Sequence, residues 1–187
     1  MINNKVEEIK EHVEAIMEIL DIPITESNKN TPLRVAKMWC NELFQNRNNS
    51  NLEELNSRMK LFPNNYDSDM VIVKDIPFHS TCEHHWLPFS GVVTVGYVPN
   101  NTIIGLSKIP RVVKYFSRKP QLQEKLTTEI AEYLWEILEP HALFVEIESK
   151  HQCVMCRGAE SDCSTKTYFK RCNRGFESSY REFKDRM

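Results

Sequence analysis

The sequence predicts an α+β fold in which an antiparallel sheet carries helices on one face and follows an N-terminal helical element. Three observations support this class. Apolar residues recur at helical spacing early in the chain, short β-like runs begin after Asp69, and further helical patterns separate those runs. The chain has 187 residues, 41% of them hydrophobic and 27% charged, which is ordinary for a globular protein. We therefore expect a helical region at residues 1–65 and one main domain at residues 66–187.

The helical region is expected to contain two packed helices. The first has an apolar stripe over residues 6–20 and ends at Asp21-Ile22-Pro23, because the residue before a proline disfavours helix. Thr31 is expected to cap the second helix, with Pro32 at its first position. A polar loop is expected to follow at residues 46–51.

The main domain is expected to begin with three short strands, at residues 70–76, 91–98 and 102–106. Pro99-Asn100-Asn101 separates the last two runs and is typical of a hairpin turn.

Two helices and a further strand are expected next. Ser107 is placed to cap a helix that ends near residue 117. Pro120 is expected to open the second helix, which carries a long apolar stripe. A strand at residues 143–148 then leads directly into His151.

Two clusters of potential metal ligands are the most informative feature of the chain. One is Cys82-Glu83-His84-His85, and the other is His151-Gln152-Cys153. Zinc is held by thiolate sulfur and imidazole nitrogen, and a catalytic zinc keeps three protein ligands and one open position. Cys82, His85 and Cys153 can supply the three ligands, which leaves two spare imidazoles. This pattern indicates an enzyme, because an open zinc site activates water and imidazoles transfer protons near neutral pH.

A closed structural zinc site is the alternative that the spacing leaves open. Cys156 forms a CxxC with Cys153, and together with Cys82 and His85 it would complete a four-ligand set without a position for water. A protein of that kind would bind or assemble rather than catalyse. Against this alternative, a closed site gives no role to the two spare histidines.

Composition limits the classes of partner. A formal net charge of −2 gives no bulk field that would attract nucleic acid. The chain starts with a polar, acidic segment rather than an apolar secretory core, and no apolar run has membrane length. Six irregularly spaced cysteines fit metal binding in a reducing compartment better than a disulfide framework. We therefore expect a cytoplasmic protein without nucleic-acid or membrane partners.

Basic residues near the ligand clusters indicate an anionic substrate. Lys108 and Arg111 lie in the first turn of the helix that follows Ser107, where free N–H groups and the helix dipole also favour anions. Arg157 follows Cys153 by four residues. Together these cations predict a phosphate clamp.

The order of these motifs resembles that of GTP cyclohydrolase I. The resemblance covers most of the chain from about residue 21 onward, and the combination is far more specific than the Cys-Glu-His-His tetrapeptide alone. The matching segments are Thr31-Pro32-Leu33-Arg34-Val35-Ala36-Lys37-Met38, Ser80-Thr81-Cys82-Glu83-His84-His85, Gly105-Leu106-Ser107-Lys108-Ile109 with Arg111, Gln121-Leu122-Gln123-Glu124-Lys125-Leu126-Thr127, His151-Gln152-Cys153 and Arg157-Gly158.

The resemblance implies the tunnelling fold, in which sheets from several subunits join into a barrel within a toroidal homodecamer. It places active sites at subunit boundaries and makes residues 66–187 the catalytic domain. It also implies the conversion of GTP and water to formate and 7,8-dihydroneopterin triphosphate. That reaction is the first step toward tetrahydrofolate, or toward related pterins or deazaguanine nucleosides.

The site residues of the family match this chain residue by residue. The zinc ligands fall on Cys82, His85 and Cys153, and the catalytic histidines fall on His84 and His151. The residues that bind guanine and triphosphate fall on Gln123, Glu124, Ser107, Lys108, Arg111, Arg157 and Lys37.

The chain departs from the family pattern after Arg157-Gly158. The family usually has a small-residue, hydroxyl-rich segment there, whereas residues 164–168 read Ser-Thr-Lys-Thr-Tyr and basic residues follow. Cys156 also stands where the family has a residue that does not bind metal. A tunnelling-fold relative that acts on a different purine or pterin is therefore a third interpretation.

Overall fold

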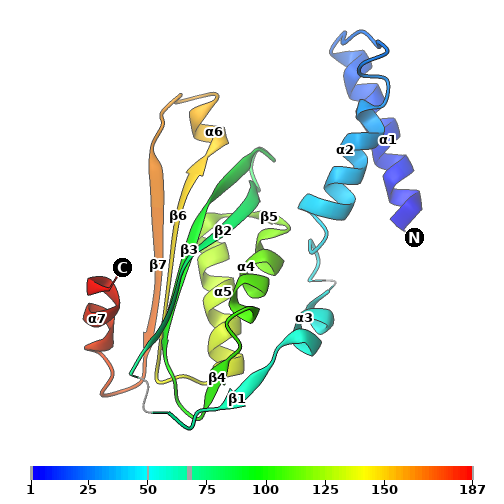
Figure 1. Ribbon diagram of the computed structural model, residues 1–187. Helices are drawn as coiled ribbons and strands as arrows, with labels where there is room; N and C mark the ends of the chain where they lie inside the picture. The colour runs from blue at the N-terminus through cyan, green and yellow to red at the C-terminus, as the bar shows by residue number, and fades with distance from the viewer. Residues whose placement is uncertain (1, 50, 67–68, 187) are drawn as a thin grey trace.

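A curved five-stranded sheet forms the centre of the structure, with strands in the order β5-β2-β3-β6-β7 (Figure 1). The computed structural model describes residues 2–49, 51–66 and 69–186. Neighbouring strands are antiparallel, except that β5 runs parallel to β2. The strands are β2 (Val71–Cys82), β3 (Pro88–Val98), β5 (Pro120–Gln121), β6 (Ala142–His151) and β7 (Ser164–Cys172).

Helices α4 (Lys108–Ser117) and α5 (Gln123–Leu138) cover one face of this sheet (Figure 1). Alternation along β6 directs Val145 and Ile147 toward them, and both side chains are buried in the main core. The layer of helices on an antiparallel sheet confirms the predicted α+β class.

A further helix, α7 (Ser179–Asp185), covers part of the opposite face. Phe144 points to that face from β6 and packs against Phe183 of α7, with ring centroids 5.1 Å apart. Gly96 of β3 makes room for this contact, because a Cβ atom there would lie 2.5 Å from the Phe183 ring. The prediction that helices lie on one face only is therefore wrong for α7. The face of the sheet opposite α4 and α5 also carries apolar side chains, and α7 shields part of them from water.

The N-terminal helices pack on each other beside the sheet (Figure 1). Val6 and Ala36 form the centre of a small apolar cluster between them, which confirms the two predicted helices. Thr31 is not the helix cap as predicted, since Asn30 holds that position and Thr31 is the first helical residue. The elements of this region are α1 (Ile2–Ile19), α2 (Thr31–Met38) and the π-helix η1 (Trp39–Leu43).

A small two-stranded sheet follows the helical region. Helix α3 (Leu52–Arg58) leads into β1 (Leu61–Pro63), and β1 pairs antiparallel with β4 (Thr102–Ile104). The predicted hairpin at residues 99–101 is therefore wrong, because β3 already has β2 and β6 on its two sides. The proposed domain boundary at residue 65 falls between β1 and its partner and stays a prediction.

The segment before α5 also differs from the prediction. Pro120 does not open a helix; with Gln121 it forms β5, which pairs with Thr81 and Cys82 of β2. Proline is tolerated there because β5 is an edge strand. The helix begins only at Gln123. Ser107 does occupy the N-cap position of α4, although its side chain makes no capping hydrogen bond.

The strand predicted at residues 70–76 extends much further than expected. It passes through a bulge between Val73 and Ile76 and continues to Cys82, where the first ligand cluster starts.

Within the described residues, no helix combines the length and the apolar character that crossing a membrane requires.

Candidate metal centre and active site

The turn between β2 and β3 carries the first ligand cluster. Cys82 ends β2, and its backbone N–H donates to the Leu87 carbonyl at 2.8 Å. The Trp86 N–H donates back to the Cys82 carbonyl at 2.9 Å. Trp86 takes a positive φ of 56°, which is uncommon for a bulky residue. This tight reversal keeps His85 next to Cys82.

Strand pairing brings the second cluster to the same place. In the antiparallel pair of β3 and β6, Phe89 lies opposite His151, so β6 ends beside the start of β3. A single helical turn, α6 (Gln152–Met155), follows at once and carries Cys153. Two segments that are far apart in the sequence therefore meet at one end of the sheet.

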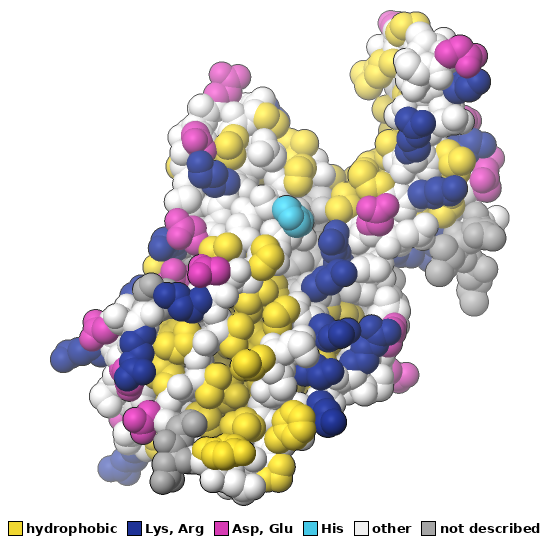
Figure 2. Space-filling model, viewed as in Figure 1, with side chains coloured by type: hydrophobic (Ala, Val, Ile, Leu, Met, Phe, Trp, Pro, Cys, Tyr) yellow, Lys and Arg dark blue, Asp and Glu magenta, His cyan; other side chains and the backbone are white. Residues whose placement is uncertain are grey.

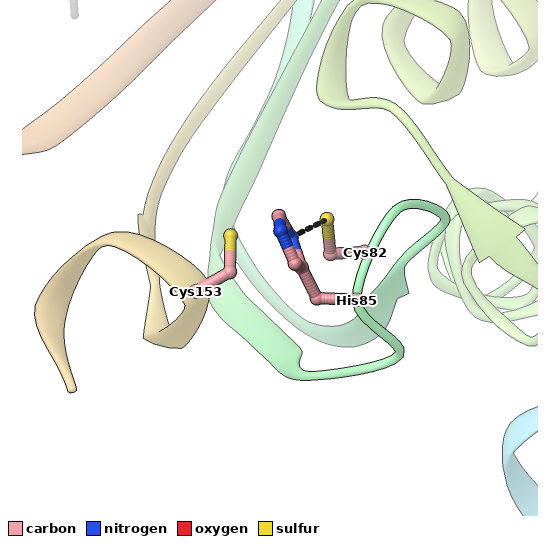
Figure 3. Close-up of side chains that lie close together, drawn as sticks. All are labelled: Cys82, His85 and Cys153. Carbon is pink, nitrogen blue, oxygen red and sulfur yellow. Dashed lines mark hydrogen bonds between the residues drawn. The ribbon is translucent and has the colours of Figure 1, made fainter. Parts of the chain in front are cut away.

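Cys82, His85 and Cys153 point toward one another (Figure 3). Their ligand atoms, two sulfurs and one imidazole nitrogen, all lie within 4.8 Å of one another. The Cys82 Sγ is 3.8 Å from Nδ1 of His85. Two thiols and an imidazole match the donor set that zinc prefers. The residues present therefore fit a zinc ion with three protein ligands.

The surroundings of the two thiols also suit a cation. Burial raises the pKa of the Cys153 thiol, and the hydrogen bond and charge of Cys82 raise it further, while Arg157 acts in the opposite direction. Two adjacent thiolates repel each other, and a divalent cation between them removes that repulsion as the thiol protons leave.

Cys156 lies outside this group. It follows α6 and is exposed. In the part of the chain that the structure describes, Cys82, His85 and Cys153 are the one set of three or more such ligands that meet. The closed four-ligand arrangement is therefore not formed, which leaves a three-residue set.

The two spare histidines have different surroundings. His84 is exposed, and its Nδ1 lies 3.9 Å from the Cys82 Sγ. His151 is half-buried, and its ring stacks on Phe89 with centroids 4.5 Å apart. Burial lowers the pKa of His151, and the nearby Glu124 carboxylate partly opposes this effect. Glu124 is thus the charged neighbour of the more enclosed histidine.

Gln123 contacts His151 from the protein interior. Its Oε1 lies 2.8 Å from His151 Nε2 and accepts a hydrogen bond from Ser149 Oγ at 2.7 Å. Its Nε2 donates to the carbonyls of Ile147 and Thr165, both at 3.0 Å. The side chain is buried in these interactions. The expected contact of Gln123 with guanine stays a prediction.

The predicted triphosphate-binding residues lie on separate elements. Ser107, Lys108 and Arg111 lie at the start of α4, whereas the exposed Lys37 lies on α2. Among the described residues, no hydrogen bond or ion pair joins these four to the cysteine–histidine group. Arg157 is nearer, because it follows α6 and acts on the pKa of Cys153. Figure 2 shows lysine and arginine side chains gathered in the region of α4 and α3.

Two residues around His151 were not found from the sequence. Ser149 precedes His151 by two positions on β6, so strand alternation places both side chains on one face. This spacing could have identified Ser149 as a neighbour of His151 from the sequence. Phe89 could be identified only through the register of β3 against β6, which no local pattern contains.

Comparison with known proteins finds relatives over most of the chain. The family model described as GTP cyclohydrolase I matches residues 9–185. A protein named GTP cyclohydrolase 1 from Hydrogenobaculum sp. (strain Y04AAS1) is 46% identical over 158 residues, covering 83% of this chain and 81% of its own. The protein of the same name from Bacillus cytotoxicus is 42% identical over 156 residues, covering 82% of this chain and 80% of its own.

Among solved structures, an archaeosine synthase QueF-like protein in the apo form aligns with 56% of this chain and 95% of its own. The TM-score is 0.48 and the sequence identity 16%. Because that structural likeness is weak, the assignment rests on the sequence matches, which extend across both the helical region and the sheet. On those matches, the chain belongs to the GTP cyclohydrolase I family.

Proposed function

We propose that this protein is a zinc-dependent GTP cyclohydrolase I that converts GTP and water to formate and 7,8-dihydroneopterin triphosphate. The observation that carries the proposal is the meeting of Cys82, His85 and Cys153 next to the strand end that holds His151, in a chain of this family. The product would enter the synthesis of tetrahydrofolate, or of a related pterin or deazaguanine nucleoside.

Cys82, His85 and Cys153 would hold the zinc ion, and three protein ligands are the number typical of a catalytic zinc. When bound, zinc supplies Lewis-acid chemistry that activates water. His84 and His151 would transfer the protons. Protonation of the guanine ring at N7 makes C8 more electrophilic, so that water adds there and the five-membered ring opens to a formamide. A second water then releases formate, and one water is lost when the rearranged ribose closes onto the pyrimidine amine.

The substrate would be held at both ends. Glu124 is exposed on the first turn of α5, beside His151, and its carboxylate suits the N–H donors of the guanine ring. Gln123 would lie next to the same ring. The cations and the hydroxyl group proposed for the triphosphate are Ser107, Lys108, Arg111, Arg157 and Lys37.

Open sheet edges support the proposal that subunits join into a tunnelling-fold barrel and a homodecamer. Within the described part of the chain, β5 pairs only with Thr81 and Cys82 and leaves the rest of that edge of β2 unpaired, and β7 is the last strand at the opposite edge of the sheet. Unpaired edges readily accept a strand from another chain.

Exposed hydrophobic side chains are a second observation in favour of an oligomer. They gather in the lower middle of the molecular surface that Figure 2 shows. Ile19 and Leu20 of the helical region are also exposed. A second subunit would cover such surfaces and bring its own cations to the site.

The test is to incubate the purified, zinc-loaded protein with GTP and to follow formate and pterin absorbance together. We expect both products in equal amounts. The Cys153→Ala variant should lose metal and turnover, whereas the matched Cys156→Ala variant should keep both. Intact GTP after incubation with a fully loaded protein would exclude the proposal. A panel of other purine nucleotides would then identify a relative with a different substrate.

A further inference from the structure

The hydrogen bonds around His151 distinguish its two ring nitrogens. Nε2 faces Gln123 Oε1 at 2.8 Å and Ser149 Oγ at 3.1 Å. No hydrogen bond from another described residue reaches Nδ1. The protonation of Nε2 therefore depends on which of these neighbours donate and which accept.

The orientation of the Gln123 amide follows from its other contacts. Its Nε2 lies 3.0 Å from the carbonyl oxygens of both Ile147 and Thr165, and carbonyl oxygens can only accept. The reversed amide would place an oxygen against both carbonyls. Because Gln123 is only 2% exposed, water cannot relieve that repulsion. The amide oxygen must therefore face His151.

The position of the histidine proton follows in turn. An amide oxygen cannot donate, and Ser149 has a single hydroxyl proton, which it gives to Gln123 Oε1 at 2.7 Å. If His151 Nε2 were bare, its lone pair would face the amide oxygen at 2.8 Å with no proton between them. If Nε2 carries the proton, every group in the set has a partner.

The ring is also held against rotation. Phe89 is 1% exposed and stacks on His151 with the two ring planes 5° from parallel. Turning the ring over would remove Nε2 from Gln123 and leave a buried amide oxygen with one donor fewer. Stacking therefore fixes the plane of the ring, and the hydrogen bonds fix which edge of the ring faces Gln123.

We propose that Gln123 is a positioning residue that holds His151 as the tautomer with its proton on Nε2, so that Nδ1 is the atom that exchanges protons with the substrate. The proposal rests on the cyclohydrolase function above and deepens it by naming the atom. Gln123 Oε1 accepts the hydrogen bond from Nε2–H, which leaves Nδ1 as the ring nitrogen without a partner among the described residues.

The first test reads the tautomer without turnover. Zinc-loaded protein with ¹⁵N-labelled histidine is examined at alkaline pH by long-range ¹H–¹⁵N correlation, with His151→Gln used to assign the signal. We expect the proton on Nε2 and a bare Nδ1. A proton on Nδ1 with a bare Nε2 would overturn the proposal. Since no GTP is present, this result is independent of whether the protein is a cyclohydrolase.

The second test compares Gln123→Glu with Gln123→Met. Both variants lose the amide donor to Ile147 and Thr165, and Gln123→Glu also turns a carboxyl oxygen toward those two carbonyls, so its structural damage is at least as great as that of Gln123→Met. Only the methionine variant also loses the oxygen that faces His151. We expect a mixed tautomer signal and a fall in kcat of the order of 10²-fold for Gln123→Met. Gln123→Glu should keep the Nε2–H signal and a higher kcat, and equal tautomer signals in the two variants would contradict the assigned role.

Discussion

Phe89 and His151 lie face to face at the end of the sheet, with ring centroids 4.5 Å apart and planes 5° from parallel. The two residues are also backbone partners in the pairing of β3 with β6. Strand register and ring packing therefore fix the same imidazole, which is the more enclosed of the two proposed catalytic histidines.

Replacing Phe89 by Leu should lower both stability and turnover. The smaller side chain leaves a partly filled cavity, which should cost about 1–2 kcal/mol in the free energy of unfolding. It also removes the flat surface under His151, so kcat should fall while metal content stays unchanged. Phe78→Leu is the matched control, because Phe78 packs edge-on against Phe89 and is similarly buried. Equal losses of kcat in the two variants would argue against a specific role for the stack.

Removing the metal should destabilise the fold. A ligand that binds only the folded state stabilises it by about 2.7 kcal/mol when its free concentration is 100 times its Kd. Chelation should therefore lower the free energy of unfolding of the unsubstituted protein by about that amount, which is seen as a lower denaturant midpoint. The Cys82→Ser variant should be insensitive to the chelator. A midpoint that does not change on chelation would show that the cysteine–histidine group holds no metal.

Stability should fall at alkaline pH because of Tyr133. Burial raises its pKa to about 12, and its hydroxyl donates to Asn56 Oδ1 at 2.8 Å. The folded state therefore keeps this proton between the unfolded pKa of about 10 and the folded value, and it binds more protons than the unfolded state does. The free energy of unfolding should decrease across that window by about 2 kcal/mol. Tyr133→Phe should show a shallower decrease over the same range in denaturant titrations at fixed pH, and identical slopes would contradict the assignment.

Gly96→Ala should displace α7. The added methyl group would lie 2.5 Å from the Phe183 ring, and overpacking of this kind costs about 1–3 kcal/mol. Phe183→Leu in the same chain should restore part of the lost stability, because the smaller side chain can give way. Denaturant unfolding of the two single variants and the double variant measures this coupling. If the two single variants lose free energy of unfolding and the double variant loses the sum, Gly96 is not needed to make room for the Phe183 ring.

Local sequence patterns predicted much of this structure. The apolar stripes of α1 and α5 each reflect one buried face, which a short window of sequence reveals. The run of β6 was also recognised as a strand from its sequence, although both of its faces are buried over most of its length. The nearness of Cys82 and His85 was equally local, because one tight turn joins them.

The remaining features depend on pairing between distant segments. The strand at Thr102–Ile104 was expected beside β3, but β1 is its partner, and no residue within the turn encodes that choice. The Gln123–His151 contact needs the docking of α5 onto β6 and was likewise out of reach. Sequence reasoning assigned Gln123 to the substrate by family resemblance, while the fold shows how fully its side chain is engaged inside the protein.

The separation of the ligands has a consequence for a chain still being made on the ribosome. His85 is synthesised well before Cys153, and at 5–20 residues per second the interval is about 3–14 s. Throughout that interval the nascent polypeptide contains only two of the three proposed ligands, Cys82 and His85. In the proposed site the third ligand becomes available only after β6 has been synthesised and has docked on β3, so zinc loading would come late in the production of each chain.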